Sequence, residues 1–318
     1  MKNTLHITAL FSLFLLVSTC EKEVQLDIEE VDSKLAILCD FSPDEPFILE
    51  LTKSKSINST KVVSNIINNA DVQICVNNEL VETIPPRNNS SNANTKYQSS
   101  IVLPKIKQVY TLKVEVDGLA PITAISSIPE AVEISHSSIG QINTYFTDDD
   151  ETVNYEVRLG VQLEDPADET NYYQISFYQE VLTSTPSAQQ NEIKIIPNEG
   201  YSLIDDDLTN NFNLINGGVL FKDLTFNGTT KEFVFQPSFY YKPEDLSTNT
   251  SSTPINIIIE LRSVSEEYYK YYTSVYRQTA QDNNTPFSNP TVIYSNIKNG
   301  YGIFAGYSKS TVKTPIEL

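Results

Sequence analysis

The sequence predicts an all-β fold: an N-terminal immunoglobulin-like β-sandwich, then a second, mainly antiparallel β domain with one amphipathic helix. Three observations predict it. Short stretches in which apolar and polar residues alternate recur from residue 34 into the C-terminal third of the chain. Stretches rich in Pro, Asn, Ser or acidic residues separate them, as loops separate strands. Only residues 263–281 show helical spacing instead.

Residues 33–130 form the first predicted domain. Phe47, Leu49 and Leu51 alternate with polar neighbours, and Asn77-Asn78 lies where a tight hairpin turn needs positive φ angles. Seven short strands in about a hundred residues are typical of an immunoglobulin-like sandwich. The predicted strands are 34–41, 46–52, 70–77, 79–84, 96–103, 108–117 and 121–128.

Two cysteines fall in this domain, Cys39 and Cys75. By strand parity Cys39 shares its face with Leu35, Ile37 and Phe41 and points inward, whereas Cys75 lies on the outward face of its strand. This favours independent thiols over a disulfide, although a β-bulge would shift the parity and permit one.

Residues 131–318 form the second predicted domain. Its clearest strand is 155–163, in which five apolar residues alternate with polar ones. In the helix, Ser263 and Glu266 have capping-box spacing, and Arg277 lies near the negative end of the dipole. Val264, Tyr268, Tyr271, Tyr272 and Val275 share one helix face, which we expect to pack on a sheet; the alternative is a stacking platform for sugars or peptides.

Residues 1–19 read as a lipoprotein signal peptide. A lysine precedes an apolar run, Leu5 to Val17, which is shorter than the roughly 20 residues that span a bilayer. The run ends at Val17-Ser18-Thr19-Cys20, which resembles a lipobox, although Thr19 replaces the usual smaller residue. We therefore expect a covalent lipid on Cys20 that anchors the chain to a membrane. The alternative is an ordinary signal peptide in which Cys20 is incidental.

Residues 20–32 are predicted to form an acidic tether, and the whole chain is acidic as well. It has 41 Asp and Glu against 22 Lys and Arg, a formal net charge of −19. Nucleic-acid binding is not expected, because proteins that bind nucleic acids present basic surfaces.

Few residues could support catalysis. His136 is the one histidine outside the leader, so a zinc site with several histidines cannot be assembled, and no Gly-x-Ser-x-Gly motif is present. We expect no catalytic residue, no enzyme activity and no cofactor beyond the lipid. Clustered carboxylates are weak candidates for calcium ligands, without EF-hand spacing: Asp148, Asp149 and Asp150, and Asp205, Asp206 and Asp207.

A series of segments resembles one protein family. The strand ending in Glu164-Asp165-Pro166 is followed by Asn171–Ile175, then Phe221–Gly228, the tyrosine-rich helix, Pro286–Pro290 and Ser295–Tyr307. Together they resemble Bacteroidetes lipoproteins grouped as domain of unknown function 4249. The resemblance implies a surface lipoprotein, often encoded near TonB-dependent receptors, and carries over no catalytic residue.

The glycine-containing segment 299–307 closes this series. Asn299-Gly300, Gly302 and Gly306 permit tight turns and close backbone approach, so we expect a closing β-hairpin or a bulged strand. A phosphate-binding loop is the weaker alternative, because no lysine or helix start follows at the required spacing.

Two functions remain open at this point. The first is a non-enzymatic lipoprotein on the outer surface of the outer membrane, an accessory subunit of a complex with a TonB-dependent receptor-type barrel. The alternative is an independent surface protein that binds a glycan or a matrix component, and a hydrolase is the third and weakest interpretation. The ligand is not predicted.

Overall fold

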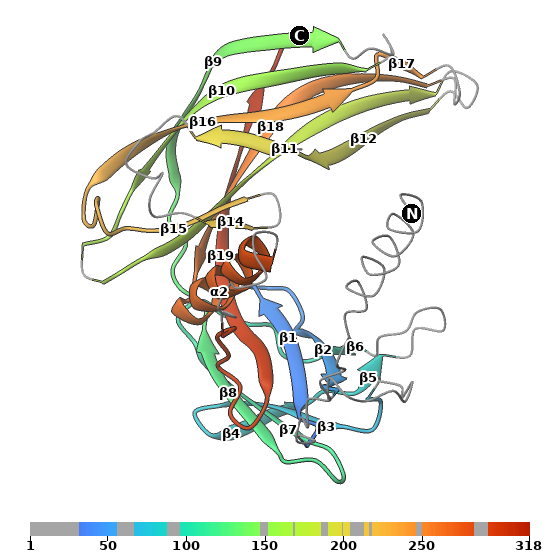
Figure 1. Cartoon of the computed structure of the whole chain (residues 1–318), viewed down its shortest axis with the longest axis vertical. Helices are drawn as coiled ribbons and strands as arrows, with labels where there is room; N and C mark the ends of the chain where they lie inside the picture. The colour runs from blue at the N-terminus through green and yellow to red at the C-terminus, as the bar shows by residue number, and fades with distance from the viewer. Residues whose placement is uncertain are drawn as a thin grey trace, which may run out of the picture. The chain divides into compact units, whose positions relative to one another are not determined.

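The structure is a computed structural model that describes residues 32–55, 67–87, 96–146, 152–167, 169–185, 190–198, 200–203, 213–215, 218–245, 250–282 and 292–318. Its described elements form three β-sheets and one helix, α2 (Figure 1). They all belong to one compact unit, residues 33–54 and 63–318; the other unit, residues 1–32 and 55–62, lies almost wholly outside the described residues. The predicted all-β class is confirmed.

Strands of the N-terminal region surround one apolar core. A four-stranded sheet, in the order β4-β3-β7-β8, contributes Ile74 and Leu112, and β1 and β2 contribute Ile37 and Leu49. This is the sandwich arrangement that the alternation predicted. The strands are β1 (Leu35–Phe41), β2 (Ile48–Lys53), β3 (Asp71–Val76), β4 (Glu79–Thr83), β5 (Pro86–Arg87), β6 (Lys96–Gln98), β7 (Val109–Glu115) and β8 (Ile122–Ser127).

The β3–β4 hairpin has the predicted turn. Asn77 and Asn78 have φ angles of 51° and 66°. Two consecutive positive φ values are the requirement of the two-residue turn whose twist matches that of antiparallel strands. Asparagine accepts this conformation better than other residues with a side chain, so the pair Asn-Asn fixes the hairpin locally.

Strands of the second region form a second apolar core. The predicted strand 155–163 lies in β10, where Tyr155, Leu159 and Leu163 are fully buried, and it pairs with β9 and β16. The strands are β9 (Ile134–Phe146), β10 (Val153–Glu164), β11 (Tyr172–Thr185), β12 (Gln190–Pro197), β13 (Gly200–Leu203), β14 (Asn213–Ile215), β15 (Gly218–Lys222), β16 (Thr230–Tyr241), β17 (Glu244–Asp245), β18 (Thr250–Val264) and β19 (Tyr301–Pro315).

The last strand, β19, joins the two regions in one eleven-stranded sheet. It pairs antiparallel with β18 and parallel with β1, which lies about 260 residues earlier in the chain. Of the two expected forms, a closing β-hairpin or a bulged strand, the hairpin is wrong, because 301–315 is a single strand, and its pairings with β1 and β18 show no register shift. Residues from the predicted second domain, Ile297 and Phe304, lie in the core of the first.

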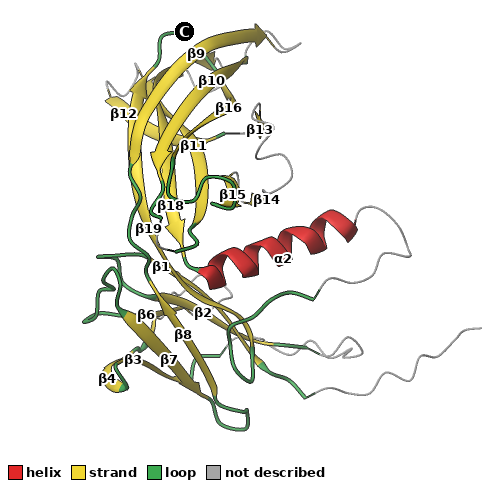
Figure 2. Ribbon diagram, turned by 90° about the vertical axis from the view of Figure 1, so that its left-hand side faces the viewer, coloured by secondary structure: helices red, strands yellow, loops and turns green. Residues whose placement is uncertain are grey.

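Helix α2 spans Glu266–Asp282 and directly follows β18 (Figure 2). Its N-cap is Ser265, whose Oγ accepts the Tyr268 N–H at 3.4 Å. The capping box expected at Ser263 is wrong, because β18 runs to Val264 and the Ser263 hydroxyl accepts the Val132 N–H. Arg277 also lies outside the last turn, because the helix continues to Asp282. Among the described helical residues, no helix is long and apolar enough to cross a membrane.

Candidate functional site

Strands β1 and β19 have two differently covered faces. Their inward residues, such as Ile37 and Phe304, lie in the N-terminal core. On the outward face, Asp40 pairs in register with Ala305, and Leu38 pairs with Ile303. Helix α2 covers part of this outward face through a smaller cluster whose buried members are Leu220, Val264, Tyr268, Ile303 and Ala305.

The tyrosines of α2 mostly pack, as the sequence favoured. Four of the five residues predicted for the apolar face belong to the small cluster; Val275 does not. Tyr268 is almost fully buried, and its ring lies 4.5 Å from that of Tyr272, centroid to centroid. These rings therefore form a packed layer between helix and sheet rather than an open stacking platform.

Hydrogen bonds connect this tyrosine layer to the sheet. The Tyr268 hydroxyl donates to Oε1 of Gln174 on β11 at 2.7 Å. The Tyr272 hydroxyl donates to Oδ2 of Asp40 on β1. A buried hydroxyl without a partner is costly, so these two bonds fix the position of α2 on the sheet.

Asp40 is the carboxylate under the helix, and its surroundings disfavour its charge. Burial raises its pKa from 3.8 to about 6, although the Tyr272 hydrogen bond and the charge of Arg262 both act to lower it. Its second oxygen, Oδ1, is buried and has no hydrogen-bond partner among the described residues. Arg262 is turned elsewhere: it pairs with Glu260 at 2.7 Å and lies 4.6 Å from the Tyr307 ring centroid.

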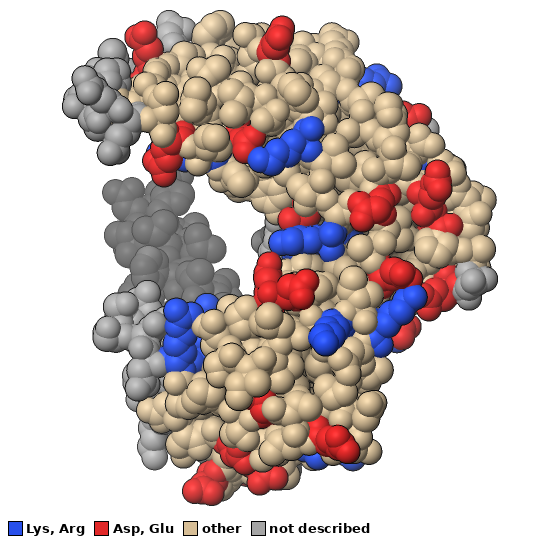
Figure 3. Space-filling model, turned by 180° about the vertical axis from the view of Figure 1, so that it is seen from behind, with Lys and Arg blue, Asp and Glu red and all other residues tan. Residues whose placement is uncertain are grey.

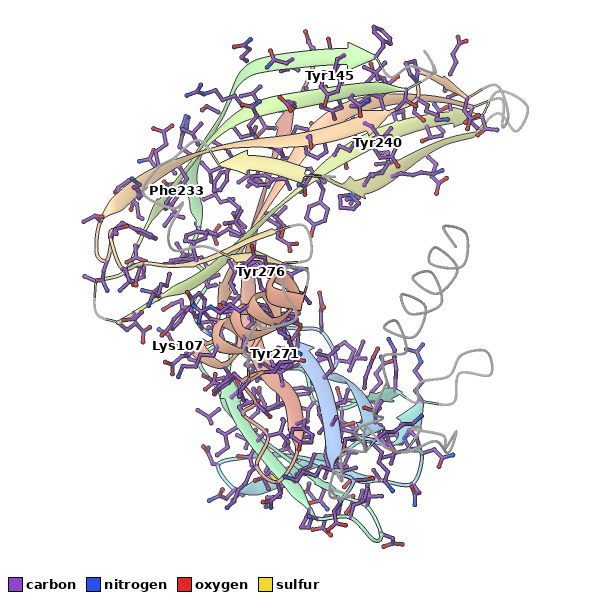
Figure 4. All side chains as sticks on the ribbon, in the orientation of Figure 1. Lys107, Tyr145, Phe233, Tyr240, Tyr271 and Tyr276 are labelled. Carbon is purple, nitrogen blue, oxygen red and sulfur yellow. The ribbon has the colours of Figure 1, made fainter. Side chains whose placement is uncertain are left out.

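Beside this layer, the uncovered part of the outward face is the floor of a groove with a volume of about 430 Å³. Tyr271 of α2, which is labelled in Figure 4, and the segment 293–295 form its wall. The lining is mainly apolar and aromatic: Ala36, Ile37, Leu38, Glu50, Thr52, Tyr271, Ile293, Tyr294, Ser295, Tyr301 and Gly302. We call this set of residues the outer-face groove.

The wall of the outer-face groove is attached at both ends. The Tyr294 N–H donates to Ser274 Oγ of α2 at 2.9 Å, and Lys270 lies over the Tyr294 ring. Asn296 bonds both the N–H and the carbonyl of Phe304 on β19. These contacts fix the wall to α2 on one side and to β19 on the other.

Polar groups in the outer-face groove are few. Glu50 pairs with Lys96 at 2.8 Å, and the Lys34 ammonium lies 5.3 Å from the Tyr301 ring centroid. An apolar, aromatic concavity of a few hundred Å³ with a few polar groups is the usual form of a small-ligand site. This geometry suits an amphipathic ligand whose polar part reaches a rim that carries Lys34 and Lys270.

A second cavity, of about 480 Å³, lies at the start of α2 and has a different character. Its lining includes Glu130, Glu169, Glu266 and Glu267, together with Lys107, which pairs with Glu130 at 2.5 Å. The face shown in Figure 3 carries acidic and basic side chains interspersed, without one continuous charged field. We do not assign a ligand to the second cavity. Its carboxylates are partly paired with lysine, and they do not converge on one point.

The structure describes only some of the residues singled out from the sequence. Cys20, Asp148, Asp149, Asp150, Asp205, Asp206 and Asp207 lie outside the described residues. Within the described part of the chain, no cluster of three His, Cys, Asp or Glu residues could hold a metal ion. His136 is exposed on β9 opposite Gln162.

Both described cysteines are free, as the parity argument favoured, and both are buried. Cys39 belongs to the N-terminal core, whereas Cys75 is buried outside every apolar cluster. Cys75 is covered despite its outward parity, next to an irregularity in the β3–β4 pairing. Burial, and then the charge of Asp40, raise the pKa of the Cys39 thiol.

The outer-face groove itself was missed at the sequence level. One signal was available: Leu38 occupies an outward position of β1, where the alternation calls for a polar residue. That single exception could not reveal the wall, because Tyr271, Tyr294 and Tyr301 reach the same place only through the β1–β19 pairing.

A comparison with models of protein families gives a match over most of the chain. The family model for a domain of unknown function, DUF4249, matches residues 21–313. No curated protein matches the chain.

Proposed function

The chain belongs to the DUF4249 family, as its ordered motifs led us to expect, and we propose that it is a non-catalytic surface lipoprotein, an accessory subunit of an outer-membrane complex. The observation that carries this proposal is the run Leu5–Val17 leading to Val17-Ser18-Thr19-Cys20. The family match begins at residue 21, directly after Cys20. A leader that ends at Thr19 and leaves Cys20 as the lipidated N-terminus would keep the whole matched region in the mature chain.

The proposed partner is a barrel of the TonB-dependent receptor type in a Bacteroidetes outer membrane. The resemblance stated above supports this partner, and the charged stretch 20–32 supports display on the cell surface beyond the anchor. The outer-face groove supports a role in capturing an amphipathic ligand close to the barrel. In this arrangement the lipid holds the protein at the membrane, and the β-rich domain makes the contacts.

The anchor is tested by Cys20→Ser in the full chain. We expect the variant to lose incorporation of an alkyne-labelled fatty acid and to leave the membrane fraction, because the thiol that carries the lipid is gone. Cys75→Ser is the matched control, since this thiol lies outside the apolar clusters. Equal labelling of the Cys20→Ser and Cys75→Ser chains would show that Cys20 is not the lipidation site.

The partner is tested separately by purification of the affinity-tagged full chain from detergent-solubilised outer membrane. We expect a barrel protein to co-purify in a fixed ratio. Purification of the chain alone, with bound carbohydrate, would contradict the accessory role and favour the independent glycan-binding alternative. A measurable hydrolytic turnover, abolished by a change to one carboxylate, would contradict the non-catalytic proposal.

A further inference from the structure

Among the described strands, β12 is an edge of the large sheet. It pairs with β11 along Gln190–Pro197, and no described strand pairs with its other side. An edge strand leaves a row of backbone N–H and C=O groups that can add a strand from another chain (Figure 1).

The side chains of β12 do not protect this edge in the usual way. Ile193 and Ile195 are 58% and 61% exposed. They lie on the face opposite to Glu192 and Lys194, which are also exposed. Charges on an edge strand normally discourage pairing with a copy of the same strand, because like charges meet. Here the two charges are of opposite sign and two residues apart, and within one chain they lie 3.7 Å from each other as an exposed ion pair. In a dimer each would exchange this exposed partner for one on the other copy.

We propose that two copies of this chain pair antiparallel along β12, about a two-fold axis at Ile193. In that register Glu192 of each copy lies opposite Lys194 of the other, so two ion pairs form on one face. Ile193 meets Ile193 on the other face. The interface is self-complementary, as a two-fold contact requires, and opposite charges directly across a strand pair are stabilising.

The alternative antiparallel register, centred on Lys194, is disfavoured on two grounds. It sets the two Lys194 ammonium groups directly against each other. It also draws Pro197 into the ladder opposite Asn191, although proline has no N–H to donate. The register centred on Ile193 pairs Gln190–Ile196 and ends before the proline.

Cysteine cross-linking of the full chain in detergent tests the contact and its register. Directly opposed residues have Cα atoms about 5 Å apart, within the range that a disulfide spans. We expect Ile193→Cys to give a disulfide-linked dimer on a non-reducing gel. Ile195→Cys should not, because the two positions would be roughly 14 Å apart along the strands.

Two controls complete this test. Leu80→Cys is the matched control: Leu80 is 54% exposed and lies on β4, the edge strand of a different sheet. The unmodified chain gives the background, since Cys39 and Cys75 are buried. No cross-link at Ile193, equal cross-linking at all three sites, or a dimer from Ile195→Cys alone would each overturn the proposal.

Charge reversal tests the same interface without relying on a disulfide. We expect Lys194→Glu to weaken dimerisation in sedimentation by about tenfold, because Glu192 of each copy then faces a second carboxylate on the other. Glu192→Lys should weaken it for the same reason, with two lysines opposed. A mixture of the two variants should dimerise again, because both contacts are then between opposite charges. A mixture as monomeric as its components, or a monomeric unmodified chain, would contradict the proposed pairing.

Discussion

The two faces of strand β1 bury their residues by different means. On the inward face, Phe41 packs against Phe47 and Phe304, with ring centroids 4.9 and 4.6 Å apart, in an apolar core. On the outward face, Asp40 is held under α2 by the Tyr272 hydroxyl. The first face gains stability from apolar area alone, whereas the second depends on hydrogen bonds to a partly buried carboxyl group. The inward face therefore serves folding, and the outward face retains a groove and a titratable group.

The largest effect is expected from Gly302→Ala, which affects both faces. Gly302 has a φ angle of 100°, and a Cβ there would lie 1.8 Å from the carbonyl oxygen of Ile37. Because this clash is with backbone, the β1–β19 pairing must separate, and we expect a loss of about 5 kcal/mol or failure to fold. Urea denaturation and the yield of soluble protein measure this.

Gly118→Ala is the control for that prediction. Gly118 also has a positive φ, 78°, but a Cβ there would meet nothing within 4 Å. Only the backbone conformation is then strained, at a cost of about 1 kcal/mol. Similar losses from the two substitutions would show that the close approach of β19 to β1 is not what requires glycine at 302.

Phe304→Ala tests the inward face alone. The side chain is fully buried, so its removal should lower the free energy of unfolding by about 4 kcal/mol through lost apolar burial and a cavity. The loss should be nearly constant between pH 4 and pH 8, because the cavity is lined by apolar groups. Denaturation at several pH values checks this, and a loss that changes steeply with pH would contradict the purely apolar character of this face.

Asp40→Asn tests the outward face and should show the opposite pattern. The carboxyl group has a folded pKa of about 6 against 3.8 unfolded, so its contribution to stability is fully present below pH 4 and lost as the pH rises through 6. At pH 7.5 the ionised group lowers the free energy of unfolding by about 2 kcal/mol. This is somewhat less than the free energy that corresponds to the whole pKa difference, because water still reaches the carboxyl group.

We therefore expect Asp40→Asn to raise the free energy of unfolding by about that amount at pH 7.5 and to leave it nearly unchanged at pH 3.5. Asp117→Asn, at an exposed turn, controls for the loss of one negative charge. A gain from Asp40→Asn that is the same at both pH values, or a loss at pH 7.5, would show that the buried charge does not limit stability.

The sequence predicted those parts of the fold that are decided locally. Asn77-Asn78 defined a hairpin, and the alternation along 155–163 defined a strand buried on one face, because both depend on neighbouring residues. The helix start was misplaced by two residues, because the hydroxyls of Ser263 and Ser265 look equivalent until β18 is known to run to Val264.

The candidate site could not be predicted in the same way. Its floor exists only because β19 pairs in parallel with β1, and no short-range pattern specifies a partner about 260 residues away. The segment 299–307 was recognised as unusual, but its glycines were consistent with a hairpin as well as with the close approach that occurs. Strand parity places Asp40 on the outward face of β1, and no neighbouring residue in the sequence indicates that α2 covers it.

The smallest expected change in stability comes from the open part of the outward face, and it has the most direct bearing on function. Leu38 is 41% exposed on the groove floor, so Leu38→Gln should change the free energy of unfolding by less than about 0.5 kcal/mol. It should nevertheless weaken binding of the amphipathic dye 1-anilinonaphthalene-8-sulfonate, followed by fluorescence, because the amide interrupts the apolar floor. Ile125→Gln is the matched control: Ile125 is 58% exposed on β8 and does not line the groove. Equal dye binding by the two variants would mean that the groove is not a binding site for apolar groups. The exposure of Leu38 would then have no explanation in ligand binding.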